Sequence, residues 1–365
     1  MSAPTHTVIS RPAADHVRAL PKAELHVHVE GAATAATIAD LAVENGIDLG
    51  VDDPAELYRY RDLSDFLRVF DLVCRTLSSA DNIHRVCYEA LQIAAAAGVR
   101  YREMFFSPTF LLRHGMPFDE IWTGLARAAR DAEHDFGVRC RLILDIDKPS
   151  GPGAADELIE LAERCDRDLL IGIGGDAGER DVDLASLAGP FATARRRGWH
   201  TTMHLGEEGP VADIRVGVST LGLERIDHGV CLPDDPGLMA EVIERGIPLT
   251  CCPTSNVRIG VVPSIEAHPI AAMRDAGVLV TVNSDNAEMF GVDMADELCS
   301  VSDAFGWGLA ELEDLCLAAV TASWAPDDDK RALESSFQHE MDDLRVAHGI
   351  STRFRPVEVG QTEKW

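Results

Sequence analysis

Eight short apolar runs alternate with amphipathic stretches along this chain, and that rhythm constrains its fold more than any other feature. The first run ends near Gly31, and the other seven cover residues 99–106, 138–146, 169–173, 201–205, 225–230, 247–252 and 279–283. Helical spacing lies between them, as in residues 32–45, 118–136, 154–165, 184–197, 238–245 and 265–276. Strands that alternate with helices favour a parallel sheet, and eight such units favour a closed barrel. We therefore predict an α/β fold with a single (β/α)8 barrel of the TIM type.

The barrel is predicted over residues 19–345, with additions at three places. Residues 1–18 are polar and indicate a flexible N-terminal arm. Residues 52–97 follow the first strand with helical spacing, which predicts a helical insertion that covers the site as a lid. The chain after about residue 300 is helical and acidic, which predicts extra C-terminal helices before a tail at residues 346–365.

Composition limits the classes of partner. The chain has 33 Lys and Arg against 61 Asp and Glu, a formal charge of -28, which disfavours binding to nucleic acid or to an anionic membrane surface. Nine cysteines without C-x-x-C spacing argue against a disulfide framework and favour a reducing compartment. No secretory signal or membrane-spanning run is visible. We therefore expect a cytoplasmic protein with a small-molecule substrate. The sequence leaves open whether the chain forms a homo-oligomer.

Two histidines, His26 and His28, stand near the end of the first predicted strand. Successive side chains in a strand point to opposite faces, so residues two apart share a face. Two imidazoles on one face supply half of a metal site. The alternative is a surface strand with two incidental histidines, because short motifs match by chance.

Further residues of the same chemical types follow other predicted strands: His204 and Glu207 the fifth, His228 the sixth and Asp285 the eighth. Each alone has an ordinary explanation as a turn residue or helix cap. In a barrel of this kind, however, the carboxyl ends of the strands carry the active site. The set therefore predicts a metal site at the mouth of the barrel. The remaining histidines receive no role: His6, His16, His84, His114, His134, His200, His268, His339 and His348.

Imidazoles with a carboxylate suit zinc, with one position left open for water. Bound zinc lowers the pKa of that water from ~15.7 to roughly 7. The reaction then needs an acid for the group under attack, and Glu207 lies three residues beyond His204 on the same predicted loop. His228 is placed to orient the water and to stabilise its developing charge.

These residues stand in longer motifs, which are Pro-Lys-Ala-Glu-Leu-His-Val-His (21–28), His-Leu-Gly-Glu (204–207), His-Gly (228–229), Cys-Pro-Thr-Ser-Asn (252–256) and Asn-Ser-Asp (283–285). Their order and register, from about residue 16 to 340, resemble the adenosine/adenine deaminase family, one of the metal-dependent amidohydrolase barrels.

The resemblance implies one zinc ion per chain, bound by His26, His28, His204 and Asp285. It also implies that Glu207 protonates the purine nitrogen N1 while hydroxide attacks C6. In that scheme His228 and Asp285 hold the hydroxide. We find no lysine at a strand end where carbamylation would hold a second metal, which favours a single ion.

Asn286 departs from the family pattern, in which a second Asp follows the metal-binding Asp and contacts the purine nitrogen N7. N7 accepts hydrogen bonds, so a carboxyl satisfies it only when protonated, whereas an amide donates directly. Asn286 therefore suits a purine, and it equally suits a carbonyl or ring nitrogen of another heterocycle. A tolerated variation and a changed substrate both stay open.

Five further residues are predicted to contact the substrate. A glutamate at position 30 resembles the pattern of the free-base and aminofutalosine branches of the family, whereas nucleoside deaminases more often carry Asp at this position. Gly174 and Gly175 would let a backbone N–H approach the ligand, and a plain βα turn is the alternative. Phe66 and Phe70, on the insertion, would shape the pocket, and simple helix packing is the alternative.

The leading hypothesis is a zinc-dependent hydrolytic deaminase of a 6-aminopurine nucleoside or base, of the adenosine, adenine or aminodeoxyfutalosine type, that releases ammonia. A second hypothesis keeps this chemistry but changes the ring because of Asn286. A third, of another class, is a non-catalytic barrel used for ligand binding. The presence of the acid Glu207 beside the metal-ligand types argues against the third.

Overall fold

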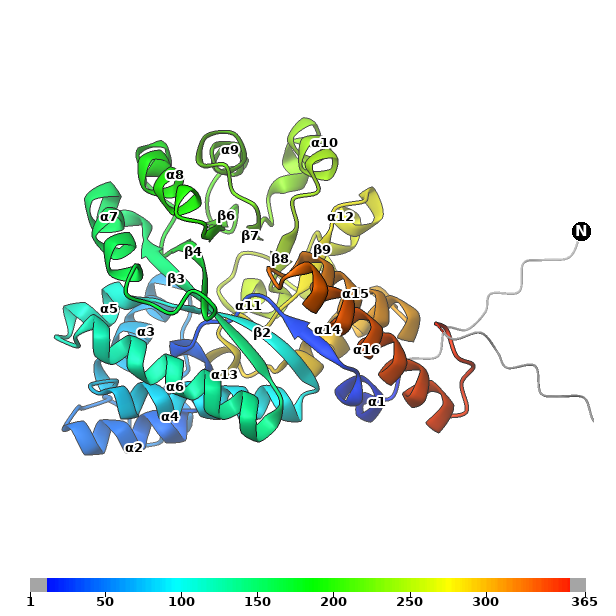
Figure 1. Ribbon diagram of the computed structural model, residues 1–365, viewed down its shortest axis with the longest axis horizontal. Coiled ribbons are helices and arrows are strands. Elements are labelled where there is room, and N and C mark those ends of the chain that lie inside the picture. Colours follow the sequence, from blue (N-terminus) through cyan, green and yellow to red (C-terminus); the bar gives the residue numbers. More distant parts are fainter. Residues whose placement is uncertain (1–11, 355–365) are drawn as a thin grey trace, which may run out of the picture.

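The computed structural model describes residues 12–354, and its strands are all parallel to their neighbours (Figure 1). The strands are β1 (Lys22–Glu24), β2 (Val99–Phe106), β3 (Arg139–Asp147), β4 (Leu170–Asp176), β5 (His200–Thr201), β6 (His204–Leu205), β7 (Ile226–His228), β8 (Leu249–Cys251) and β9 (Val280–Val282). They form two sheets in the orders β1-β2-β3-β4-β5 and β6-β7-β8-β9.

Main-chain hydrogen bonds join the two sheets at both edges. At one edge, β5 and β6 are the two parts of the strand predicted over 201–205, and the Thr202 N–H between them still bonds the Ile173 carbonyl of β4 at 3.2 Å. At the other edge, the His28 N–H bonds the Asp285 carbonyl at 2.9 Å and the Asp285 N–H bonds the His26 carbonyl at 3.1 Å. The predicted eight-stranded α/β barrel is confirmed.

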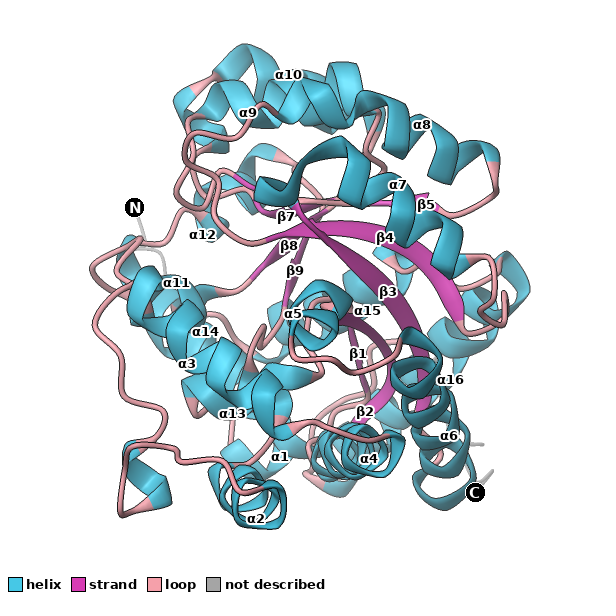
Figure 2. Ribbon diagram, turned by 90° about the vertical axis from the view of Figure 1, so that its left-hand side faces the viewer, coloured by secondary structure: helices cyan, strands magenta, loops and turns pink. Residues whose placement is uncertain are grey.

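Helices lie around the strands and over one end of the barrel (Figure 2). They are α1 (Ala14–Ala19), α2 (Ala35–Asn45), α3 (Leu63–Thr76), α4 (Ala80–Ala96), α5 (Pro108–Arg113), α6 (Phe118–Phe136), α7 (Gly151–Ala162), α8 (Ala188–Arg196), α9 (Val211–Val216), α10 (Pro236–Arg245), α11 (Pro253–Arg258), α12 (Ile270–Ala276), α13 (Ala287–Phe290), α14 (Met294–Phe305), α15 (Leu309–Ala322) and α16 (Asp327–Ala347).

Helix α6 illustrates why the sequence pattern predicts these bounds. Its buried residues Ile121, Leu125, Ala128 and Ala132 repeat every three or four positions, which forms one apolar stripe. The helix ends where Gly137 adopts a left-handed conformation with φ of 71°, which costs glycine little and other residues more. The predicted helix over 118–136 has the observed bounds.

The first strand is shorter than predicted. The β1–β2 ladder ends at Glu24, and the next N–H, that of Leu25, bonds the side-chain oxygen of Asn283 at 2.9 Å. The chain stays extended beyond this point, because Val27 and His28 form isolated bridges to Asp285 and Phe105. Both histidines therefore still reach the mouth of the barrel.

The segments outside the barrel pattern agree with the predictions to different extents. Of the predicted flexible arm, residues 1–11 lie outside the described residues, but Ala14–Ala19 form helix α1 with Val17 buried and Arg18 paired with Asp293 at 2.6 Å. That part is docked, contrary to the expectation of a flexible arm. The insertion over 52–97 contains α3 and α4, as its helical spacing predicts. The domain limits at 19 and 345 stay predictions, and residues 355–365 of the tail lie outside the described part.

A buried ion pair lies inside the barrel, toward the end away from the predicted site. Arg225, with no exposed surface, donates to Glu103 at 2.6 Å, and its guanidinium lies 3.8 Å from the ring centroid of Trp324. The other oxygen of Glu103 accepts from the hydroxyl of Tyr101 at 3.0 Å and from the N–H of Trp324 at 2.6 Å.

Glu103→Gln is expected to lower the free energy of unfolding by roughly 3–5 kcal/mol, because it removes the carboxylate 2.6 Å from the buried Arg225 guanidinium and leaves only the longer contact of 3.8 Å to Asp227. Urea denaturation measures the change. The matched control is Asp40→Asn, which breaks an ion pair to Arg85 whose aspartate side chain is 68% exposed, and we expect it to cost less than about 1 kcal/mol. Equal losses in the two variants would contradict the burial argument.

All nine cysteines are free thiols, as their spacing predicts. Among the described residues, no helix combines the length and apolar character that a membrane crossing requires.

Candidate active site

Four side-chain atoms at the carboxyl end of the barrel form three neighbouring pairs at the spacing of a metal's ligands. His26 Nε2 and His28 Nε2 lie 3.5 and 3.4 Å from Asp285 Oδ1, and His28 Nε2 lies 3.1 Å from His204 Nε2. Tetrahedral bonds of 2.0–2.2 Å to one ion separate its ligands by about 3.3–3.6 Å. All four residues are buried, so the arrangement fits a metal ion with three nitrogen ligands and one oxygen ligand.

Hydrogen bonds on the far side of two imidazoles aim their Nε2 lone pairs at this point. The Thr250 hydroxyl donates to Asp227 at 2.7 Å, so it accepts from His26 Nδ1 at 3.0 Å. His204 Nδ1 donates to the Gly175 carbonyl at 3.0 Å, because a carbonyl only accepts. In both rings the proton is on Nδ1 and Nε2 is free for a metal. His26 Nε2 is buried with no hydrogen-bond partner in the described structure, as a metal ligand would be.

Asp285 follows β9 in a left-handed conformation with φ of 61°, which non-glycine residues rarely adopt. Its Oδ2 accepts from the Ser255 hydroxyl at 2.5 Å, and its Oδ1 accepts from the Asn286 amide at 2.8 Å. His228, at the end of β7, also has a positive φ, of 64°. Backbone strain of this kind concentrates at functional sites, where the surrounding structure holds it.

Glu207 lies on the loop after β6, and a second carboxylate shapes that loop. Glu179 accepts the backbone N–H groups of Gly206, Glu207 and Gly209 at 3.0, 3.1 and 2.8 Å. Burial, Asp285 and Glu179 together raise the pKa of the Glu207 carboxyl well above its ordinary value. The surroundings therefore favour the protonated form that an acid requires. Sequence analysis missed Glu179, because nothing in the sequence marks its three backbone contacts.

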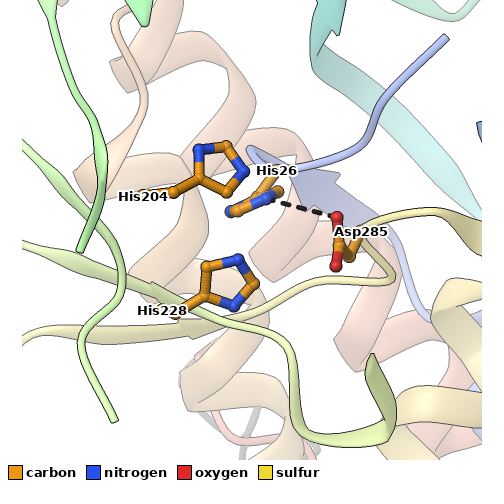
Figure 3. Close-up of side chains that lie close together, drawn as sticks. All are labelled: His26, His204, His228 and Asp285. Atoms are coloured by element: carbon orange, nitrogen blue, oxygen red, sulfur yellow. Dashed lines mark ion pairs between the residues drawn. The ribbon is translucent and has the colours of Figure 1, made fainter. Parts of the chain in front are cut away.

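His228 lies beside Glu207, with 3.4 Å between its Nδ1 and Glu207 Oε1, and burial lowers the pKa of its imidazole. His228 also faces His26, His204 and Asp285, and one ligand atom from each of these four residues lies within 4.8 Å of the others (Figure 3). A further group joins His28 and His204 to Asp176. The predicted residues thus converge on one point, and Asp176 is an addition that sequence analysis did not single out.

A pocket above this cluster is lined by three of the predicted substrate residues. Phe66 and Phe70 come from α3 and Asn286 from the loop after β9, and Phe290 and the cluster residues other than His26 complete the lining. The free volume inside is about 30 Å³. The other three predictions, Glu30, Gly174 and Gly175, are not among the residues that line it.

Those three residues support the wall behind the pocket. Glu30 accepts the Ser107 N–H at 2.9 Å, and its second oxygen is buried without a partner in the described structure. A Cβ at Gly174 would lie 2.2 Å from Asp145 Oδ1, so this glycine is required for close packing. Gly175 supplies the carbonyl that orients His204.

The expectation of a single metal ion did not take into account Lys148, which lies beside a strand end. Lys148 directly follows β3, is 1% exposed, and its Nζ donates to the His204 carbonyl at 2.7 Å. The predicted strand stopped at residue 146, which left Lys148 in the following loop. Its ammonium holds the strand that carries His204.

A parallel α/β barrel with a histidine and aspartate cluster at the carboxyl ends of its strands is typical of metal-dependent hydrolases. The sequence profile of the adenosine deaminase family matches residues 21–340. The chain belongs to this family, and it is a metal-dependent hydrolase of C–N bonds with deaminase chemistry.

Individual relatives agree with this family assignment. The chain is 34% identical to an adenine deaminase of Streptomyces coelicolor, over 87% of this chain and 94% of the relative. It is 31% identical to an adenine deaminase of Vibrio parahaemolyticus, over 91% and 98%. The crystal structure of an adenine deaminase from Arthrobacter aurescens superposes with a TM-score of 0.84 at 30% identity, over 88% and 99%. A zinc-bound amidohydrolase from Burkholderia ambifaria superposes with a TM-score of 0.86 at 30% identity, over 94% and 97%.

Proposed function

We propose that this chain is a zinc-dependent deaminase of a 6-aminopurine, with the free base adenine as its substrate and ammonia as a product. One observation carries the proposal: the ligand cluster and the acid Glu207 share one mouth, with Glu207 Oε1 held 3.4 Å from His228. The adenine deaminases at 31–34% identity support adenine as the substrate.

One zinc ion per chain would be held by His26, His28, His204 and Asp285. The separations of 3.1–3.5 Å among their ligand atoms support this set, as does the zinc-bound relative. When bound, zinc supplies a Lewis acid that ionises water near neutral pH. A second metal has less support, because the ammonium of Lys148 is engaged by a carbonyl.

The protein's own groups divide the remaining work. Glu207, whose raised pKa favours the protonated carboxyl, donates its proton to ring nitrogen N1 as the purine carbon C6 is attacked. His228 and Asp285 face this point from β7 and from the loop after β9, and they orient the attacking water. Loss of ammonia then gives the 6-oxopurine.

The insertion would act as a lid. A water molecule needs roughly 10–15 Å³ of such free volume, so about 30 Å³ is too little for a purine. Phe66, on α3, stacks on Phe290 with ring centroids 5.2 Å apart and closes the pocket from above. We expect α3 to move aside for the substrate and to return over it. Glu30, with one oxygen unpaired, would then receive an N–H of the free base.

Asn286 would contact the substrate at N7. Its Oδ1 faces Gly31, where a Cβ would lie only 1.8 Å away, and its amide donates one hydrogen to Asp285 Oδ1 at 2.8 Å. The second amide hydrogen remains for a ring acceptor. The same donor suits a carbonyl on another aminated heterocycle, which is the second candidate substrate class.

Asn286→Asp is expected to retain adenine deamination at low pH and to lose it as pH rises. The new carboxyl donates to N7 only when protonated, and the adjacent Asp285 raises its pKa because two like charges repel. Asn286→Ala, the matched control, lacks the donor at every pH and should be slower than wild type throughout. The pH dependence of kcat/KM for adenine tests this prediction. Identical profiles for wild type and Asn286→Asp would refute the contact between Asn286 and N7.

Ammonia release over a substrate panel tests the function itself. The panel contains adenine, adenosine, 2′-deoxyadenosine, aminodeoxyfutalosine and several aminated non-purine rings. The proposal expects adenine to have the highest kcat/KM. A higher value for a non-purine ring would support the second candidate, and turnover of none would support a ligand-binding barrel.

The setting of the enzyme is also proposed. The free thiols support a reducing compartment such as the cytoplasm, and the charge of -28 supports a small molecule as partner. A homo-oligomer stays an open alternative.

A further inference from the structure

A chain of hydrogen bonds runs from the first residue of α12 to the acid Glu207. The Ile270 N–H donates to His268 Nδ1 at 3.1 Å, and His268 Nε2 lies 3.1 Å from Asn256 Oδ1. Asn256 Nδ2 in turn lies 2.8 Å from Glu207 Oε1. His268 is 3% exposed and Asn256 is fully buried, so water does not compete for these bonds.

The direction of every bond in this chain follows from its first donor. A backbone N–H only donates, so His268 Nδ1 accepts. Burial lowers the pKa of His268 to about 4, so its ring is neutral at pH 7 and carries its one proton on Nε2. That proton needs an acceptor, which in Asn256 is the amide oxygen. The amide nitrogen of Asn256 therefore faces Glu207.

The amide nitrogen carries two hydrogens and has two acceptors. One hydrogen points to Glu207 Oε1 at 2.8 Å, and His228 Nδ1 lies within reach of the other at 3.3 Å. Glu207 Oε1 accepts this bond, so the proton of the carboxyl belongs on Oε2. His228 Nδ1 also accepts, so the proton of that imidazole belongs on Nε2.

We propose that His268 and Asn256 are positioning residues that determine which oxygen of Glu207 and which nitrogen of His228 carry a proton. This inference rests on the proposed function, because it takes Glu207 as the acid. The proton leaves Oε2 for the ring nitrogen, and the carboxylate that remains keeps its bond from Asn256 through Oε1. The acid is thus held in one orientation before and after transfer, which is how positioned groups raise rates.

The hydrogen bond from His268 is tested with a matched pair of variants in the full-length, zinc-loaded enzyme. His268→Gln retains an N–H donor near the position of Nε2, whereas His268→Leu fills the space without a donor. We expect His268→Leu to lower kcat roughly tenfold, less than the ~100-fold that a 1 Å misplacement costs. KM and zinc content should stay the same, and His268→Gln should recover most of the rate. Equal kcat values for the two variants would overturn the proposal.

Nitrogen-15 NMR of histidine-labelled, zinc-loaded protein tests the proton positions without any substrate. The proposal predicts that His268 and His228 both carry the proton on Nε2 and have an unprotonated Nδ1. A proton on Nδ1 of either ring would overturn it. Because this readout does not require turnover, an enzyme inactive on adenine would contradict the proposed function while the spectra still decide the proposal about proton positions.

Discussion

Glu207→Gln is expected to lower kcat for adenine by roughly 10²–10⁴-fold, the usual contribution of a positioned general acid. Glutamine has nearly the same shape as the protonated carboxyl and still accepts the bond from Asn256 at Oε1. It has no acidic proton, so N1 must be protonated from water. Steady-state ammonia release measures the loss, and metal analysis checks that zinc content is unchanged.

A neighbouring carboxylate gives the control for this variant. Glu208→Gln changes the next residue, which pairs with Arg180 at 3.5 Å in a salt bridge whose arginine is 75% exposed. We expect its kcat to stay close to that of wild type, because exposed pairs contribute little. A Glu207→Gln enzyme as active as Glu208→Gln would refute the role of Glu207 as the acid.

His204→Ala is expected to abolish stoichiometric zinc binding and, with it, deamination. His204 Nε2 lies 3.1 Å from His28 Nε2 inside the cluster, and its Nδ1 is held by the Gly175 carbonyl. Removing a group that only orients a ligand costs 10–100-fold in metal affinity, so removing the ligand itself should cost more than ~100-fold. Elemental analysis after dialysis against limiting zinc measures the occupancy.

His200→Ala is the matched control, because His200 directly precedes the same predicted strand, begins β5 and lies at the other end of the barrel. There it stacks on Trp324 with ring centroids 5.0 Å apart and pairs with Glu224 at 2.6 Å. Its loss should leave zinc occupancy at one ion per chain. Full occupancy in both variants would remove His204 from the ligand set.

Sequence periodicity was sufficient to predict the barrel architecture, but it did not predict where the first strand ends or how the N-terminal helix packs. The eight apolar runs predict the barrel because a buried parallel strand must be apolar nearly throughout. The same rule misplaced the end of β1, where the Asn283 side chain takes the N–H of Leu25 and ends the ladder. It also missed the docking of α1, which depends on the bond from Arg18 to Asp293, 275 residues away.

In the candidate site, too, the sequence predicted some residues and missed others. The convergence of His26, His204 and Asp285 was predictable, because the chemistry of a metal restricts ligand types and the barrel restricts where such residues stand. Glu179 and His268 were not, since both act through hydrogen bonds to groups distant in sequence. His268 in particular was left without a role, although it is buried and oriented toward the acid through Asn256.

Titration of the metal-free protein with zinc, followed by ammonia release from adenine, tests zinc-dependent adenine deamination most directly. The cluster of three imidazoles and one carboxylate predicts no turnover without metal, a linear rise to one zinc per chain, and a plateau beyond it. Turnover that survives complete removal of metal, or a rise that continues to two ions per chain, would contradict this account.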